Sequence, residues 1–347
     1  MRILYSIFIT FITTSFLLHA RSPFRPIDPH APTICAQWQG EKTQYSLVHS
    51  HLQEGPYFNL FDKKHFYDHL LPYGPITYRH SRQTVNGAVL SELVQHLLKE
   101  VHEKKKEFTH FTVLKQRDFN TRDQTGLIIA RFKNYPFVVK LFVETPESFV
   151  SPLSKGFETS ALFILGNGIT RHLSGFTRIK NLERLREKVQ QNSYWKDKIA
   201  FPRKWFWLPR NPRWLTITGK NMGPEETRTT DIPAVYALIC DYIDVKRMFS
   251  LKSDHDRMTA MSLSNYLQQD IDPHINNYAV EKGTQKIIPI DTEHFPTMVG
   301  YDNPPLCKSY LQWYTNLGFK LLDNALGRTK EMRRHNQRRR HWPMKEF

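Results

Sequence analysis

The sequence predicts an α+β fold in which a sheet-rich lobe is followed by a helical lobe. Three observations support this prediction. Strand-like apolar runs gather between residues 110 and 143. Segments in which apolar residues recur at a spacing of three and four, typical of helices, dominate the later part of the chain. The 347 residues, of which 40% are hydrophobic, are enough for two lobes with a shared core.

The first half of the predicted fold contains one clear helix and three strands. The helix is expected at residues 90–101, where leucines and valines recur at helical spacing. The segment Lys133-Asn-Tyr-Pro136 consists of turn residues, so the strands on either side of it are expected to form a hairpin. The three strands are expected at residues 110–115, 126–132 and 137–143.

The second half is expected to be mainly helical. A strand at residues 214–218 precedes a predicted helix at residues 231–242, which Asp231 would cap and which has Pro233 in its first turn. Cys240 lies in the apolar pattern of this helix and is expected in the core. Three further elements are a short helix at residues 182–189, a small hairpin around residues 281–284 and a final helix at residues 306–321.

These elements divide the chain into five expected parts: a signal peptide (1–20), an irregular N-terminal extension (21–80), an N-lobe with a hinge (81–220), a C-lobe (221–327) and a basic tail (328–347). The apolar run Ile3 to Leu18 after Arg2 is short for a membrane span and suits a secretory signal. We therefore expect export to a secreted, periplasmic or lumenal location, with an uncleaved membrane anchor as the alternative.

The net charge of +16 is concentrated at the C-terminal end, where residues 328–347 contain eight lysines and arginines against two glutamates. One interpretation is a solvated tail; the other is a tail that binds an acidic protein or an anionic lipid. Basic residues interleaved with aromatic ones, as in RNA-binding proteins, do not accompany it, so a nucleic-acid partner is not expected.

Cysteine and histidine patterns do not predict a metal centre. Cys35, Cys240 and Cys307 are too few and too scattered for a disulfide framework or a metal cluster. Sixteen histidines are many, and His65 and His69 stand four residues apart. Because both lie in the expected irregular extension, we interpret them as a feature of composition. The sequence also contains neither Gly-x-Ser-x-Gly nor a Gly-Lys-Ser/Thr phosphate loop, which disfavours those enzyme classes.

Lys140 is the first candidate functional residue. Alternation in the strand Phe137-Val-Val-Lys-Leu-Phe-Val143 places Lys140 between Val138 and Phe142 on one face. A lysine with apolar neighbours must extend its amine to solvent, pair with a carboxylate or meet a ligand.

A second group of candidates lies in Asp270-Ile-Asp272-Pro-His-Ile-Asn-Asn277 and in Asp291, which follows the apolar run Lys286-Ile-Ile-Pro-Ile290. Phosphoryl transfer needs a carboxylate that accepts the proton of the nucleophile and oxygen ligands that hold magnesium. Asp272 suits the first role, and Asn277 and Asp291 suit the second. Taken singly, these residues would be interpreted as turn and strand-end residues; their joint occurrence favours a site.

This arrangement resembles the protein-kinase-like superfamily, closest in style to aminoglycoside and choline phosphotransferases, over roughly residues 110–325. The resemblance implies a two-lobed kinase-like fold that uses ATP and Mg²⁺. By that resemblance, Lys140 would bind the α- and β-phosphates, Asp272 would be the base, and Asn277 and Asp291 would hold magnesium. Glu293, two residues after the expected magnesium ligand Asp291, is similar to the pattern of small-molecule kinases rather than to the Phe-Gly of protein kinases.

The sequence departs from that family pattern in three places. Asp270 stands where a histidine is usual, and the candidate nucleotide turn at residues 118–126 has a single glycine. The third departure is that no motif marks the carboxylate partner of Lys140, for which we choose Glu158 over Glu183. The expected function is an ATP- and Mg-dependent phosphotransferase acting on a hydroxyl acceptor. The alternative is a catalytically inactive, exported kinase-like binding module that engages an acidic partner through its basic tail.

Overall fold

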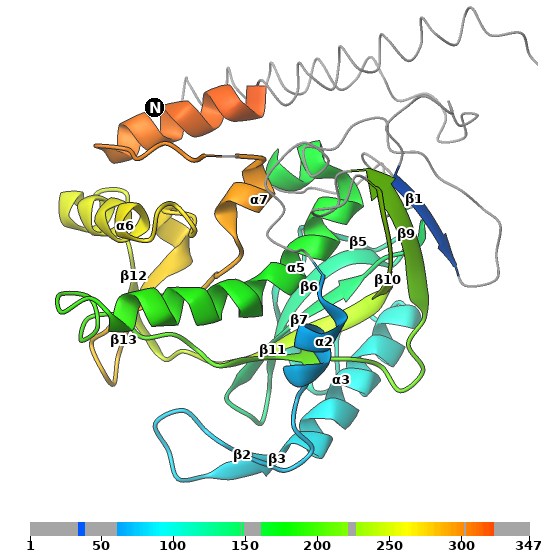
Figure 1. Ribbon diagram of the computed structural model, residues 1–347. Coiled ribbons are helices and arrows are strands. Elements are labelled where there is room, and N and C mark those ends of the chain that lie inside the picture. Colours follow the sequence, from blue (N-terminus) through cyan, green and yellow to red (C-terminus); the bar gives the residue numbers. More distant parts are fainter. Residues whose placement is uncertain are drawn as a thin grey trace, which may run out of the picture. The chain divides into compact units, whose positions relative to one another are not determined.

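The computed structural model describes residues 34–38, 61–146, 148, 161–220, 227–301 and 303–322 (Figure 1). Chain contacts divide the protein into two units, Met1–Ala31 and Pro32–Phe347, and every described residue belongs to the second. The expected signal peptide and basic tail lie outside the described residues, and so does Glu158.

The fold is mixed α+β, as predicted, and is built around one antiparallel sheet of six strands. Five of these strands follow each other in the order β4-β6-β7-β11-β8, and β5 pairs with β6 beside them. Their bounds are β4 Phe111–Lys115, β5 Phe119–Asn120, β6 Thr125–Phe132, β7 Phe137–Val143, β8 Lys204–Trp207 and β11 Val235–Asp241. The three strands and the hairpin predicted between residues 110 and 143 are confirmed.

Helices cover this sheet, because both faces of its central strands are apolar. On β7, Val139 and Leu141 belong to one buried cluster together with Leu97 of α3 (Gly87–His102). Phe142 belongs to a second buried cluster, together with Phe176 of α5 (Ala161–Gln190). The predicted helix at residues 90–101 is thus confirmed as α3, with Leu90, Val94, Leu97, Leu98 and Val101 buried.

Helix α5 packs very close to the sheet. A Cβ atom at Gly175 would lie 1.8 Å from the hydroxyl oxygen of Tyr236 on β11, so only glycine fits there. The same hydroxyl donates to the backbone carbonyl of His172, 2.5 Å away. The ring of Tyr236 stacks on the rings of Phe142 and Phe176. This contact fixes the position of α5 relative to β7 and β11.

The later part of the chain forms a mainly helical region with its own buried cluster. It contains a three-stranded antiparallel sheet in the order β12-β13-β14, and the predicted hairpin around residues 281–284 is confirmed as β13 and β14. The elements are β12 Val245–Met248, α6 Asp254–Tyr266, the 3-10 turn Ile275–Asn277, β13 Tyr278–Glu281, β14 Ile287–Pro289, α7 Phe295–Val299 and a helix at residues 310–322. Of the helices in the described residues, none is long and apolar enough to cross a membrane.

The helix predicted at residues 231–242 is wrong. This segment ends β10 (Thr227–Pro233) and then forms β11, which lies between β7 and β8 and is buried on both faces. A continuous apolar run of this length fits a buried strand as well as a helix, and periodicity alone does not separate them. Cys240 is buried, as expected, but in a strand. The main sheet therefore extends beyond residue 220, where we expected the sheet-rich lobe to end.

Three other expectations need correction. The short helix at residues 182–189 is the last part of the 30-residue helix α5. The final helix begins near residue 310, and Leu306 before it is exposed. The expected irregular extension at residues 21–80 contains regular structure: β1 (Ile34–Trp38) pairs with β9 (Trp214–Lys220), α2 spans Lys63–Asp68, and β2 (Pro75–Thr77) pairs with β3 (Thr84–Asn86).

Candidate functional site

The candidate residues lie close together, although they belong to the main sheet and to two loops. Lys140 lies on the central strand β7, paired with Leu238 of β11. Asp272 and Asn277 lie between α6 and β13, in a loop that Pro273 keeps out of helix. Asp291 follows β14. The hairpin of β13 and β14 returns the chain, so that the backbone N–H of Ile290 donates to the carbonyl of Asn277 at 2.8 Å.

Asp272 is held by two hydrogen bonds from its own loop. Its Oδ1 accepts from the backbone N–H of His274 and its Oδ2 from the side-chain amide of Asn277, both at 2.9 Å. Burial raises the pKa of Asp272 to about 7, the bond from His274 opposes this, and the negative charges of Glu293 and Asp291 add to it. A carboxyl group with this pKa exchanges a proton near neutral pH, as a general base must.

Asp291 lies between two cations. Lys140 Nζ contacts its Oδ2 at 3.2 Å and Arg178 Nε its Oδ1 at 3.1 Å. Burial opposes ionisation, but the charges of Arg178, Lys140 and Lys204 outweigh it and hold the pKa of Asp291 well below its usual range. Only 8% of the Lys140 side chain is exposed, so of the three alternatives for this lysine, pairing with a carboxylate is the one observed.

Arg178 of α5 is a functional candidate that the sequence analysis missed. Its Nη2 donates to Glu293 Oε2 at 2.6 Å, while its Nε faces Asp291. Burial would lower the pKa of Arg178, but these two carboxylates raise it above its ordinary value. A signal existed: Arg178 lies four residues before Leu182 and seven before Leu185, which puts a charge on the apolar stripe of a helix.

Lys204 of β8 is a second missed candidate. Its Nζ donates to Thr292 Oγ1 at 2.6 Å and to the carbonyl oxygen of Ile290 at 3.3 Å. Burial lowers the pKa of Lys204 to about 8. The sequence signal was weak: Lys204 shares a strand face with the buried Phe206, as Lys140 shares one with Phe142. Two buried lysines thus approach the segment around Asp291 from the same sheet.

Helix α5 also ties the two loops together. The side-chain amide of Asn181 donates to the backbone carbonyls of Asp270 and Thr292, at 2.9 and 3.1 Å. The Asp270 carboxylate pairs with Lys188 at 2.8 Å, on the last turn of α5. Asp270, which stands where the family pattern has a histidine, thus belongs to a structural ion pair.

The donors present suit magnesium. Asn277, Asp291 and Glu293 offer amide and carboxylate oxygens, which are the ligands that hard divalent cations prefer. Asp291 Oδ1 is buried and accepts no hydrogen bond of good geometry, although Arg178 lies near it. Burial and the charge of Asp291 raise the pKa of Glu293, so a cation beside both acids would favour its ionised form.

Comparisons of the chain with protein-family models, curated proteins and solved structures found no match. A function can therefore be inferred only from the contacts, burial and charges of the described residues. These bring together four of the five candidate site residues, Lys140, Asp272, Asn277 and Asp291, with Glu293, which the sequence analysis also noted, and they add Arg178 and Lys204.

Proposed function

We propose that the protein is an ATP- and magnesium-dependent phosphotransferase that transfers a phosphoryl group to a hydroxyl acceptor. One observation carries this proposal: an acid with a pKa near 7, Asp272, lies within electrostatic reach of Asp291 and Glu293, and Asp291 contacts a buried lysine on the neighbouring sheet. A base, oxygen ligands for a metal and a phosphate-binding cation are the parts that phosphoryl transfer requires.

Each part has a role that its surroundings support. Asp272 accepts the proton of the acceptor hydroxyl, and the amide of Asn277 keeps its carboxylate oriented. When bound, magnesium would be held by Asn277 and Asp291 and would offset the negative charge of the phosphates. Lys140 binds phosphate oxygens once a nucleotide competes with Asp291 for its amine.

Two features of the α+β fold support the proposal of a two-lobed kinase-like arrangement. The lysine belongs to an antiparallel sheet, and the acids belong to the loops of the helical region that follows. Helix α5 follows the lysine strand in sequence and contacts both the sheet and α7, which is the place of the helix that positions the lysine in protein kinases. Here α5 contributes Arg178 rather than a glutamate to the acid cluster.

A second candidate function, an inactive kinase-like binding module, has one observation in its favour. Lys140 and Arg178 already neutralise both oxygens of Asp291. A closed pair of this kind is stable without a metal, so nucleotide binding would have to break one buried contact. The basic tail, residues 328–347, would then provide the attachment to an acidic partner.

The test is release or transfer of the γ-phosphate of ATP by the full-length protein, with and without magnesium. Because the acceptor is unidentified, water and the protein itself serve as acceptors. Asp272→Asn removes the base at nearly constant volume, and we expect the rate to fall by roughly 10²- to 10⁴-fold. Asp197→Asn, at an exposed position outside the site, is the matched control and should leave the rate unchanged.

The outcomes separate the two candidates. Equal rates in wild type and Asp272→Asn would remove the catalytic assignment. Binding of Mg-ATP without turnover in the wild type would favour the inactive module. Absence of both binding and turnover, in protein shown to be folded, would contradict the phosphotransferase and favour an inactive module that is attached through its basic tail.

A further inference from the structure

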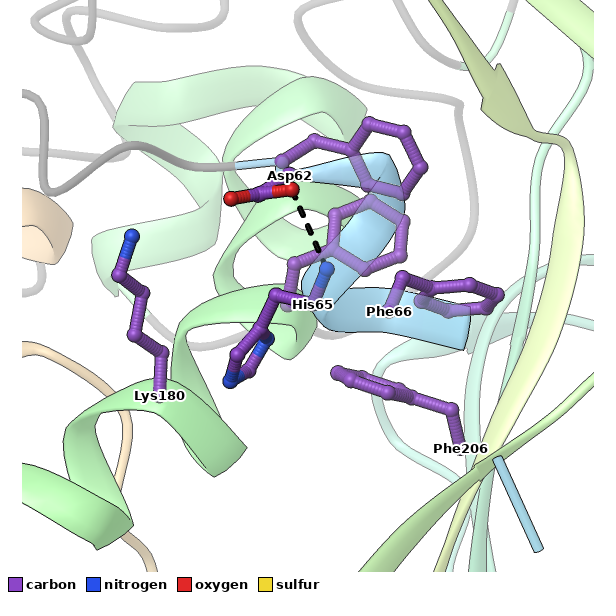
Figure 2. Close-up of a pocket in the computed structure, with 7 residues that line it drawn as sticks. Asp62, His65, Phe66, Lys180 and Phe206 are labelled. Atoms are coloured by element: carbon purple, nitrogen blue, oxygen red, sulfur yellow. Dashed lines mark hydrogen bonds between the residues drawn. The ribbon is translucent and has the colours of Figure 1, made fainter. Parts of the chain in front are cut away.

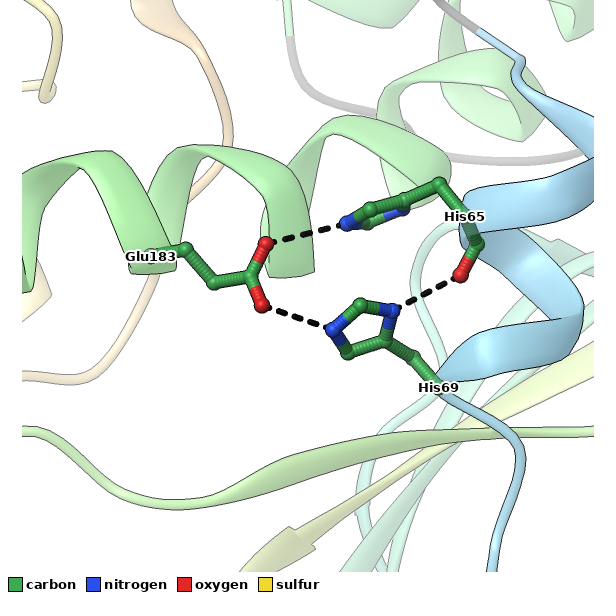
Figure 3. A group of neighbouring side chains, drawn as sticks. All are labelled: His65, His69 and Glu183. Carbon is green, nitrogen blue, oxygen red and sulfur yellow. Dashed lines mark hydrogen bonds and ion pairs between the residues drawn. The ribbon is translucent and has the colours of Figure 1, made fainter.

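A second cluster of polar side chains contains the histidine pair noted in the sequence, His65 and His69, together with Glu183. His65 Nε2 lies 3.1 Å from Glu183 Oε2, and His69 Nε2 lies 2.6 Å from Glu183 Oε1 (Figure 3). The two imidazole rings are 4.2 Å apart between centroids. One potential ligand atom from each residue falls within 4.8 Å of the others. The cluster joins α2 and its C-cap residue His69 to α5. Both histidines are more than a hundred positions away from Glu183 in the sequence.

The hydrogen bond on the far side of His69 sets its tautomer. His69 Nδ1 lies 2.8 Å from the backbone carbonyl of His65, and because a carbonyl only accepts, Nδ1 carries the proton. In the neutral ring the lone pair is then on Nε2, which faces Glu183. Metal-binding histidines are oriented in the same way, with one ring nitrogen donating to a carbonyl and the other free for the ion.

The close contact between His69 Nε2 and the Glu183 carboxylate needs a positive centre between them. A lone pair and an anionic oxygen repel each other, so the 2.6 Å contact requires either a shared proton or a cation.

Local packing fixes both histidines. Asp62 caps α2 by accepting from the backbone N–H of His65, and Phe66 is buried against Phe206 below the helix. A small pocket lies beside His65, lined by these residues and by Lys180 of α5 (Figure 2). The spacing of four residues puts both imidazoles on the same side of the helix. Their backbone positions are thus set before any ligand binds.

The cluster remains open to solvent. The exposed fractions of the side chains are 19% for His65, 28% for His69 and 48% for Glu183. A tetrahedral zinc ion with bonds of about 2.0–2.1 Å holds its ligand atoms roughly 3.3 Å apart. The two contacts with Glu183, at 2.6 and 3.1 Å, would open toward that distance, and the ligand atoms of the three residues, which lie within 4.8 Å of one another, would close around the ion. Three ligands from the protein leave a fourth position for water or a small ligand.

We propose that His65, His69 and Glu183 form a binding site for a zinc-type divalent cation that fastens α2 to α5. Two imidazoles and one carboxylate are a donor set that zinc accepts and that magnesium and calcium, which take oxygen ligands, do not favour. The site is separate from the residues of the proposed phosphotransferase and does not depend on that function. The competing explanation is a triad that shares a proton and binds no metal.

The test is titration of the full-length protein, freed of metal with a chelator, with zinc chloride in a calorimeter. We expect Glu183→Gln and His69→Gln each to bind one zinc fewer per chain, or to bind it more than about 100-fold more weakly, which exceeds the loss seen when a residue that only orients a ligand is removed. His255→Gln, an exposed histidine on α6, is the control for the other histidines and should retain the wild-type stoichiometry.

The unfolding temperature provides a second readout of zinc binding. Zinc should raise the unfolding temperature of the wild type and of His255→Gln, but not that of Glu183→Gln or His69→Gln, and magnesium chloride should not replace it. Equal zinc binding by wild type and both cluster variants would place the metal elsewhere and overturn the proposal. Absence of zinc binding by folded wild-type protein would leave the proton-sharing triad as the explanation.

Discussion

Helix α5 carries two charged clusters that differ mainly in burial. Around Arg178, with 3% of its side chain exposed, Asp291 and Glu293 are enclosed by the sheet and by the following loops. Around Glu183, with 48% exposed, His65 and His69 face solvent. The two centres lie five residues apart on one helix. The same kind of interaction therefore occurs in two environments that give it different strength and different access.

The difference has a physical consequence for each cluster. Buried charges cost several kcal/mol to desolvate, so removing one partner leaves the others uncompensated. Half-exposed charges are solvated by water and contribute little to stability, but an ion from solution reaches them without unfolding. We infer that the Arg178 cluster organises the proposed catalytic residues, whereas the Glu183 cluster is suited to reversible binding.

The largest expected effect comes from breaking the buried cluster. Arg178→Met should lower the free energy of unfolding by about 3–5 kcal/mol, because Asp291 and Glu293 lose the cation between them. The measurement is the urea midpoint. Arg210→Met, which breaks an exposed pair with Glu92, is the control and should cost less than about 1 kcal/mol. Equal losses in both variants would contradict the comparison.

A third polar group on α5 gives a pH-dependent effect of intermediate size. Burial lowers the pKa of His172 to about 3 from 6.5, and the ring contacts the carbonyl of Pro233. Between these two values the unfolded chain binds a proton that the folded protein excludes, so the free energy of unfolding falls as the pH falls. From pH 6.5 to pH 4.5 the expected loss is about 2 kcal/mol.

The readout for His172 is the difference between wild type and His172→Gln, since other groups titrate in the same range. The difference between the urea midpoints at pH 6.5 and pH 4.5 should be smaller in the variant than in the wild type. A pH dependence that is the same in both proteins would show that His172 is not excluded from protonation in the folded state.

The smallest effect is expected in the exposed cluster. In metal-free buffer, Glu183→Gln should change the free energy of unfolding by less than about 1 kcal/mol, because the carboxylate it removes is half-exposed. The urea midpoint again measures it. A loss above about 2 kcal/mol would mean that the Glu183 cluster is structural in the way that the Arg178 cluster is, and the distinction between them would fail.

The parts of the site that the sequence predicted are those set by local structure. Asp272, Asn277 and Asp291 are brought together by a proline-containing loop and by the hairpin of β13 and β14, whose turn and strand patterns are visible over about twenty residues. The sequence predicts Lys140 as a site residue because alternation in a short strand places its charge between apolar neighbours on the same face.

The parts that were missed depend on contacts between distant segments. Arg178 and Asp291 are 113 positions apart, and only the packing of α5 on the sheet, through the close approach at Gly175, brings them together. The sequence around His65 and His69 contains no signal for their contact with Glu183, so the sequence alone favours a feature of composition. The segment of β11 was assigned to a helix because burial on both faces removes the alternation that identifies a strand.

The proposal that Lys140, Asn277 and Asp291 bind a magnesium nucleotide is best tested by thermal unfolding of the full-length protein with and without Mg-ATP, beside Asp291→Ala. A ligand at 100 times its dissociation constant stabilises the native state by about 2.7 kcal/mol. If the nucleotide binds at these residues, the wild type shows a magnesium-dependent rise in unfolding temperature that Asp291→Ala, while still folded, does not show. A rise of the same size in both proteins, or none in the wild type, would contradict it.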